Sequence, residues 1–401
     1  MKSIFSNDFA QRRNCDNGRD YELFPIDSLD YCIPTNNDNS NIDTKKIIAC
    51  TFSMESVSEF TQDYLNPLQN PHWDYMTHLI FQCLIIDNNG AVKVNDGSSN
   101  SDIRRSHQTY IPFINSLRRC FPHLKIVFSF VLDFTNSALI DRCIGIQHKE
   151  FFRSLINCVD AYKADGVALN LTCIKNIPDT LINDLERIKR INDIELFITL
   201  NNKTDWTNTE NIDVLKDIAT VADMIIFNSY GFMNEIWGGT AYSPEPECSI
   251  SQFKTLISSI EDNISICNVL MGVDTSGVSY NLNSVGKATT FDLISLQKIE
   301  RLKILGDYEF SNNVNYIEND YGDEGSILEK EVRYCGKKIS YDNYQARIKK
   351  LKYVSDVNMG GCILGELRRD LYVTNKESIL NISYTLLKPF GLSLFKNKLC
   401  L

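Results

Sequence analysis

Several features on which large protein classes depend are missing from this 401-residue chain. No stretch approaches the ~20 apolar residues that a membrane-spanning helix needs, so we expect no membrane insertion. The chain has 41 Lys and Arg against 51 Asp and Glu, a net charge of −10, and no dominant basic cluster. Binding to phosphates requires clustered Lys and Arg. The acidic balance therefore argues against nucleic acid as a partner.

Metal-binding motifs are missing as well. None of the 13 cysteines forms a Cys-x-x-Cys pair, and the five histidines show no metal-ligand spacing. We therefore expect neither a metal nor a cofactor. Because the number of cysteines is odd, at least one has no partner within the chain. Cys50, Cys83, Cys173 and Cys362 lie in apolar runs, where a buried thiol is the ordinary state.

A secretion signal is not evident at the amino terminus. Asp8 and Arg12 interrupt the first residues before an apolar segment of signal-peptide length can form. Since no signal peptide is evident, we expect a cytoplasmic protein whose thiols stay reduced. Export by an unrecognised route is left open as an alternative.

The chain does contain a series of short apolar runs. Residues 1–44 are polar and without periodicity, which predicts a flexible extension, and 391–401 form a C-terminal tail. Within 45–390 the runs are continuous and not alternating, as is typical of strands that are covered on both faces. Eight runs are found, at 46–52, 78–85, 125–130, 166–171, 195–200, 224–227, 269–273 and 361–364.

Amphipathic segments between these runs indicate helices. Residues 150–159 and 344–351 both carry apolar residues at three- and four-residue spacing. Eight strands that alternate with helices predict an α/β fold, the (β/α)8 TIM barrel, in preference to a doubly wound sheet. The interval 274–340 is too long for one crossover and predicts a small inserted subdomain between strands 7 and 8.

Three segments of this region carry a recognisable order of motifs. Residues 77–81 with the following turn at 87–96, residues 121–126, and Tyr341-Asp342 with the segment 359–364 lie in sequence order. They resemble the second, third and last βα units of glycoside hydrolase family 18, the chitinases and chitinase-like lectins. The resemblance covers about 46–390. It implies a TIM barrel with an α+β insertion at 274–340.

The catalytic signature of this family is Asp-Gly-x-Asp-x-Asp-x-Glu at the end of the fourth strand. Its last Glu protonates the glycosidic oxygen, and the preceding Asp orients the N-acetyl group of the substrate, which attacks the anomeric carbon. In this chain Asp165 matches the first position, but Ala168, Asn170 and Thr172 replace the other three acids. A threonine hydroxyl cannot serve as a general acid near neutral pH. The resemblance therefore implies an inactive member.

Other positions of the family site also depart from the pattern. The glycines after the third strand are replaced at 130–132, and the Trp that lies under the sugar after the eighth strand is Gly365. The loss of this Trp removes a stacking surface. Tyr230 and Trp237 match a Tyr and a Trp that follow the sixth strand of the family, although the Asp next to that Tyr is replaced by Gly231.

Candidate glycan-binding residues remain. Trp206 lies just past the fifth strand, and Glu366 follows the eighth, at the end where barrel active sites lie. The competing interpretation is core or rim packing for the aromatic residues, and a salt bridge or solvent exposure for Glu366. The candidates for glycan binding are Tyr230, Trp237, Trp206 and Glu366.

Other acids near strand ends have simpler interpretations. Asp165 stands at the start of its strand, away from the end where sites lie, and we expect it to fix the preceding loop. Asp133, Glu235 and Asp274 follow strands, but acidic residues are common at loop ends.

We therefore expect a catalytically inactive chitinase-like protein that acts by binding, as a scaffold for a protein partner. The alternative is a lectin that holds chitin or GlcNAc oligosaccharides. Gly365 and the segment 130–132 count against the lectin, whereas Trp237, Tyr230 and Trp206 favour it. A glycosidase with replaced acid chemistry would depend on Glu366 alone. Fold by itself does not decide among these functions.

Overall fold

The chain divides into two units, residues 1–43 and 44–401. All residues that the structure, a computed structural model, describes belong to the second unit. The predicted polar extension and the C-terminal tail lie outside them. The described residues are 46–53, 71–87, 89–94, 103–130, 148–171, 179–202, 204–228, 250–282, 288–305, 316–320, 326–330, 337–371 and 375–387.

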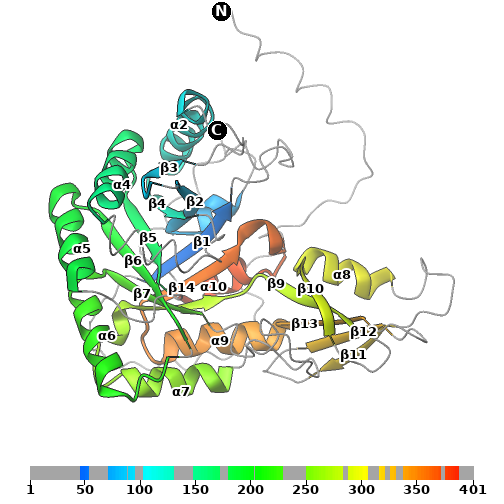
Figure 1. The fold of residues 1–401 in the computed structure, drawn as a ribbon. Helices are drawn as coiled ribbons and strands as arrows, with labels where there is room; N and C mark the ends of the chain where they lie inside the picture. Colours follow the sequence, from blue (N-terminus) through cyan, green and yellow to red (C-terminus); the bar gives the residue numbers. More distant parts are fainter. Residues whose placement is uncertain are drawn as a thin grey trace, which may run out of the picture. The chain divides into compact units, whose positions relative to one another are not determined.

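Eight parallel strands form a closed barrel (Figure 1). Closure is made by β1, which pairs with both β2 and β14. A short strand, β3 (Val92–Val94), adds to β2 in antiparallel orientation. The predicted (β/α)8 barrel is confirmed. Its strands are β1 (Ile47–Ser53), β2 (His78–Ile86), β4 (Lys125–Phe130), β5 (Gly166–Asn170), β6 (Glu195–Leu200), β7 (Met224–Asn228), β8 (Val269–Val273) and β14 (Gly361–Glu366).

Helices alternate with these strands and cover the outside of the barrel (Figure 1). In α6, for example, Ile212, Leu215 and Ile218 are buried at three-residue spacing, and the Asn208 side chain caps the first turn. The described helices around the barrel are α2 (Ile103–Cys120), α4 (His148–Tyr162), α5 (Asp179–Asn192), α6 (Thr209–Val221), α7 (Ile250–Ile260), α9 (Tyr344–Asp356) and α10 (Ile379–Leu387), with short helices η5 (Pro71–Tyr75), η7 (Ile266–Asn268) and η9 (Leu367–Arg369).

Apolar side chains form two separate clusters, one on each face of the barrel wall. The larger cluster packs between the strands and the helices; we call it the outer apolar cluster. The smaller one fills the inside of the barrel and receives at least one residue from every barrel strand; we call it the inner apolar layer. Strands buried on both faces explain why the sequence runs are continuously apolar. The inner apolar layer consists of Ile47, Ala49, Ile80, Val127, Ala168, Phe197, Ile226, Leu270 and Ile363.

The interval between β8 and β14 contains a second sheet, coloured yellow to orange in Figure 1. Its five strands are antiparallel in the order β10-β9-β13-β12-β11, and one helix accompanies them. The predicted α+β insertion between the seventh and eighth barrel strands is therefore confirmed. Its elements are β9 (Ser276–Leu282), β10 (Ala288–Ser295), α8 (Leu296–Leu305), β11 (Tyr316–Asp320), β12 (Ser326–Lys330) and β13 (Lys337–Tyr341).

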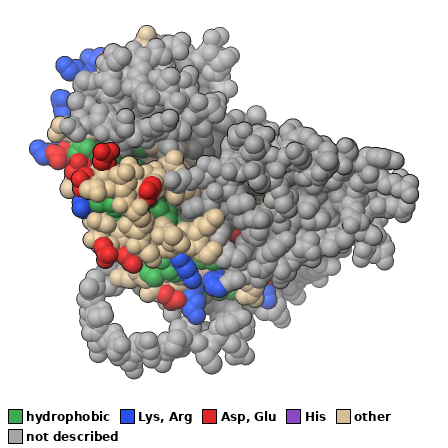
Figure 2. All heavy atoms as spheres, turned by 60° about the horizontal axis from the view of Figure 1, so that its bottom comes forward, with side chains coloured by type: hydrophobic (Ala, Val, Ile, Leu, Met, Phe, Trp, Pro, Cys, Tyr) green, Lys and Arg blue, Asp and Glu red, His purple; other side chains and the backbone are tan. Residues whose placement is uncertain are grey.

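The described surface carries charged side chains of both signs. Figure 2 shows one face on which Lys and Arg are interspersed with Asp and Glu. Some of these charges pair along helices, as Arg190 does with Glu186 at 2.6 Å in α5. Among the described residues only Leu293 and Val357 are large apolar side chains that count as exposed. This pattern is that of an ordinary solvated surface.

Candidate functional site

Neutral polar side chains follow the inner apolar layer toward the carboxyl end of the barrel. Alternation along a strand places the residue two positions beyond an inward one on the same side. The strand register makes these residues neighbours, since Gln82 pairs with Ser129 and Asn170 pairs with Thr199. We call this set the polar layer. It consists of Gln82, Ser129, Asn170, Thr199 and Asn228.

Two of the replaced signature positions, Ala168 and Asn170, lie on β5, one in each of these two layers. Ala168 is 4% exposed and belongs to the inner apolar layer with Val127 and Phe197. Asn170 ends the strand as a member of the polar layer. Thr172 lies outside the described residues. Where the family signature has acids, the described interior therefore carries a methyl group and an amide.

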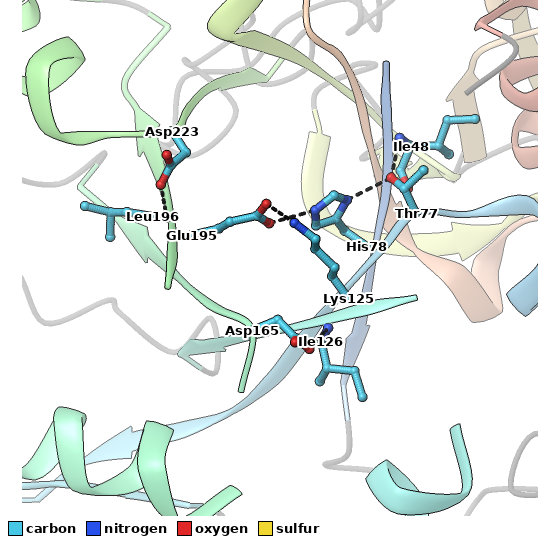
Figure 3. A network of polar contacts seen from close by, with 9 residues as sticks. All are labelled: Ile48, Thr77, His78, Lys125, Ile126, Asp165, Glu195, Leu196 and Asp223. Atoms are coloured by element: carbon cyan, nitrogen blue, oxygen red, sulfur yellow. Dashed lines mark hydrogen bonds and ion pairs between the residues drawn. The ribbon is translucent and has the colours of Figure 1, made fainter. Parts of the chain in front are cut away.

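Asp165 lies at the opposite, amino end of the barrel (Figure 3). Its Oδ2 accepts a hydrogen bond from the backbone N–H of Ile126 at 2.9 Å and forms an ion pair with Arg118 at 3.2 Å. Thr77 and Asp223 make the same kind of contact, because each precedes a strand and accepts the N–H of Ile48 or Leu196 on the neighbouring strand. The three residues thus anchor neighbouring strands at the end opposite the polar layer.

Three ionisable side chains meet inside the same amino end (Figure 3). His78 Nε2 lies 2.9 Å from Glu195 Oε2, and Lys125 Nζ contacts the other oxygen of Glu195. Burial alone would raise the pKa of Glu195, but the contacts with His78 and Lys125 outweigh it and lower the pKa to about 2. Glu195 is therefore ionised at ordinary pH and holds β2, β4 and β6 together.

A carboxyl group stands at the carboxyl end of the barrel, directly after β8. Asp274 Oδ1 accepts hydrogen bonds from the Ser276 backbone N–H at 3.0 Å and from Ser276 Oγ at 2.7 Å. Burial raises the pKa of Asp274, and the negative charge of Asp342 adds to this rise, whereas Ser276 and Arg369 oppose it. Perturbed carboxyl groups at this end of a barrel are candidates for a functional role.

The candidate glycan-binding residues differ in their placement. Trp206 is 5% exposed, packs edge-to-face on Phe227 with ring centroids 5.8 Å apart, and donates its indole N–H to the Asn201 carbonyl oxygen. Its ring belongs to the outer apolar cluster. Glu366 ends β14, where its backbone oxygen accepts a hydrogen bond from Thr275 Oγ1 at 2.8 Å.

Several of the residues singled out in the sequence lie outside the described part of the chain. They include two of the four candidate glycan-binding residues, two positions of the replaced glycine segment and two acids that follow strands. These residues are Tyr230, Trp237, Val131, Leu132, Asp133 and Glu235.

Reasoning from the sequence overlooked most of the polar layer. Only Asn170 was considered, through its match to the signature. The only signal in the sequence is alternation, because each of the other members lies two positions beyond an apolar residue of its run. Which apolar residues point inward is known only from the structure. The other members are Gln82, Ser129, Thr199 and Asn228.

Burial makes the described buried thiols poor nucleophiles. Burial raises the pKa of Cys50 and Cys83, and it raises that of Cys362 to about 12. A protonated, buried thiol is a poor nucleophile. All six described cysteines are free thiols.

Neither a metal site nor a membrane span is found among the described residues. No group of three or more His, Cys, Asp or Glu side chains there is arranged to hold a metal ion. In the same part of the chain, no helix has the length and apolar character needed to cross a membrane.

A closed eight-stranded barrel of parallel strands, with an α+β insertion before its last strand and a polar layer at its carboxyl end, is a TIM barrel. The family model of the glycosyl hydrolases family 18 matches residues 47–370. The chain belongs to this family.

Solved structures of chitinases and related proteins share the fold. The chitinase from Chromobacterium violaceum has 12% identity and a TM-score of 0.62, over 85% of this chain and 99% of that one. The immunomodulatory active chitinase from Trichuris suis has 14% identity and a TM-score of 0.62, over 86% and 100%. YKL-39, solved in the presence of chitooligosaccharides, has 16% identity and a TM-score of 0.62, over 85% and 99%.

At such low identity these similarities show the fold alone. A search of curated proteins finds no match.

Proposed function

We propose that this member of glycosyl hydrolase family 18 is catalytically inactive and acts by binding. The observation that carries the proposal is the composition of β5, where Ala168 lies in the inner apolar layer and Asn170 offers an amide. The sequence adds Thr172 at the position of the proton donor. Glycoside hydrolysis needs a carboxylic acid to protonate the leaving oxygen. None of these three side chains can supply that proton.

The polar layer supports an oligosaccharide as the ligand. Amide and hydroxyl groups both donate and accept hydrogen bonds, and they complement the hydroxyl groups of a sugar without charge. They lie at the end of the barrel where sites of this fold are built. YKL-39, which shares the fold, was solved in the presence of chitooligosaccharides. We therefore favour a lectin for chitin or GlcNAc oligosaccharides.

A protein partner is the second candidate. It is supported by the lack of an aromatic stacking surface at two places, since Gly365 has no side chain and Trp206 packs in the outer apolar cluster. Sugar rings commonly bind on such surfaces through their apolar faces. A barrel without them would serve as a scaffold.

Calorimetric titration with chitin hexasaccharide, with a hydrolysis assay on the same sample, tests the proposal. Saturable binding without cleavage, lost in Asn170→Ala but kept in Asn263→Ala, would support the lectin. Asn263 is a fair control, because it lies in the turn between α7 and β8, at the amino end of the barrel. Absence of binding at millimolar sugar would favour the protein partner. Cleavage would refute inactivity.

A further inference from the structure

Asp274 occupies the last inward position beyond β8. Leu270 belongs to the inner apolar layer, so alternation places Gly272 and then Asp274 on the same side. The register between β8 and β14 pairs Gly272 with Ile363, which brings Gly365 opposite Asp274. The geometry agrees, because a Cβ added at Gly365 would lie 3.2 Å from Asp274 Oδ1. The carboxyl group therefore lies over the neighbouring strand.

The same arrangement occurs one strand earlier. A Cβ added at Gly272 would lie 2.2 Å from Asn228 Oδ1, so the amide of Asn228 occupies the space that a side chain at 272 would need. Two glycines thus make room for two polar side chains, Asn228 and Asp274, on adjacent strands. The carboxyl group extends the polar layer, whose other members carry amide and hydroxyl groups.

One oxygen of this carboxyl group keeps its capacity to bind a ligand. Both hydrogen bonds of Asp274 in the described part of the chain go to Oδ1, from the backbone and the side chain of Ser276. A carboxylate oxygen can accept about two hydrogen bonds. Oδ2 accepts neither of these hydrogen bonds and can therefore accept one from a ligand.

The charge of Asp274 has no partner of its own among the described residues. The nearby Asp342 is neutralised by Lys350, whose Nζ lies 2.8 and 2.6 Å from its two oxygens in a buried pair. Arg369 attracts Asp274, but no ion pair joins them in the described structure. A partly buried carboxylate without an ion pair is costly, and a cationic ligand would offset that cost.

We propose that Asp274 selects a sugar unit with a free, protonated amine, so that the ligand is a glucosamine oligosaccharide, the deacetylated form of chitin. The ammonium group donates to Asp274 Oδ2, and the hydroxyl groups bind the polar layer. This inference rests on the proposed carbohydrate-binding function and deepens it by naming the substrate class. An N-acetyl group would remove the positive charge that Asp274 recognises.

The test is a calorimetric comparison of glucosamine hexamer and GlcNAc hexamer, at a pH where the free amine is protonated. The wild-type protein should bind the glucosamine hexamer about 10- to 100-fold more tightly, the range of a charge-assisted hydrogen bond. Asp274→Asn keeps the acceptor for Ser276 and should abolish this preference. Asp262→Asn, an exposed residue in the turn after α7, should leave it unchanged.

The outcomes separate the two proposals. If GlcNAc hexamer binds as well as or better than glucosamine hexamer, or if Asp274→Asn keeps the preference, the inference is wrong and the lectin function stands. If neither sugar binds, both fail. Should Asp274→Asn not fold, Gly365→Ala serves instead, because its methyl group would crowd Asp274 Oδ1 and reduce the preference while the carboxylate is retained.

Discussion

Replacing Ala168 by Asp would return an acid of the family signature to the inside of the barrel. The site does not suit a charge. Ala168 is 4% exposed, and its neighbours in the inner apolar layer include Val127 and Phe197, which are both 0% exposed. A carboxyl group without a partner in such surroundings stays protonated, because burial raises its pKa by up to about 3–5 units. We therefore expect the introduced carboxyl group to be neutral in the folded protein near pH 7.

The free-energy cost follows from the pKa difference. Holding a carboxyl group protonated from its usual pKa of about 3.9 up to about pH 7 costs roughly 4 kcal/mol, at about 1.4 kcal/mol per unit. Extra volume in a packed interior adds about 1–3 kcal/mol. Since the folded pKa is raised, the unfolded state releases its proton first. Stability therefore falls as pH rises above about 4, until the folded pKa is reached.

Urea unfolding followed by circular dichroism between about pH 4 and pH 7 measures this difference. Ala168→Asn is the matched control, because it has the same size and does not titrate. The two variants should be equally stable near pH 4 and differ by about 4 kcal/mol near pH 7, a large part of a typical total of about 5–15 kcal/mol. Equal stability of both variants at every pH would show that water or a cation reaches position 168, and our description of the inner apolar layer would be refuted.

Three further predictions follow from the structure. Asn170→Asp combined with Thr172→Glu should yield little chitinase activity, because Ala168 and Gly365 remain changed; robust hydrolysis of chitin oligosaccharide would overturn this view. Glu195→Gln should lower the free energy of unfolding by about 3 kcal/mol near pH 7, since the pKa of Glu195 falls from 4.5 to about 2. That wild-type advantage should fade as pH drops from 4.5 toward 2, and urea titrations that show no such convergence would contradict it. A thiol reagent should leave Cys50, Cys83 and Cys362 unmodified in the native protein, as peptide mapping by mass spectrometry can check, and label them only after unfolding.

The barrel strands could be located from the sequence because each is buried on both faces. Continuous apolar runs were predicted at 125–130, 195–200 and 269–273, and the strands begin and end at these same residues. The insertion was predicted from a gap too long for one crossover. Alternation within a strand also places positions 168 and 170 on the same side. All of these are properties of short segments.

Contacts between strands could not be predicted in the same way. Asp274 and Gly365 are far apart in the sequence, and only the register between β8 and β14 brings them together. In the same way, the pairing of β4 with β5 places Asp165 against the backbone of Ile126. A run that is apolar on both faces does not reveal which side chains point inward, so Ala168 could not be assigned to the inner apolar layer.

The sequence by itself thus determined the order of strands, the place of the insertion and the loss of the signature acids, because burial and alternation act within a segment. Only the tertiary structure decided which side chains meet at the carboxyl end. Barrel closure and strand register join residues that no local pattern relates. That is why the pairing of Asn228 with Gly272, and of Asp274 with Gly365, became visible only in the folded chain.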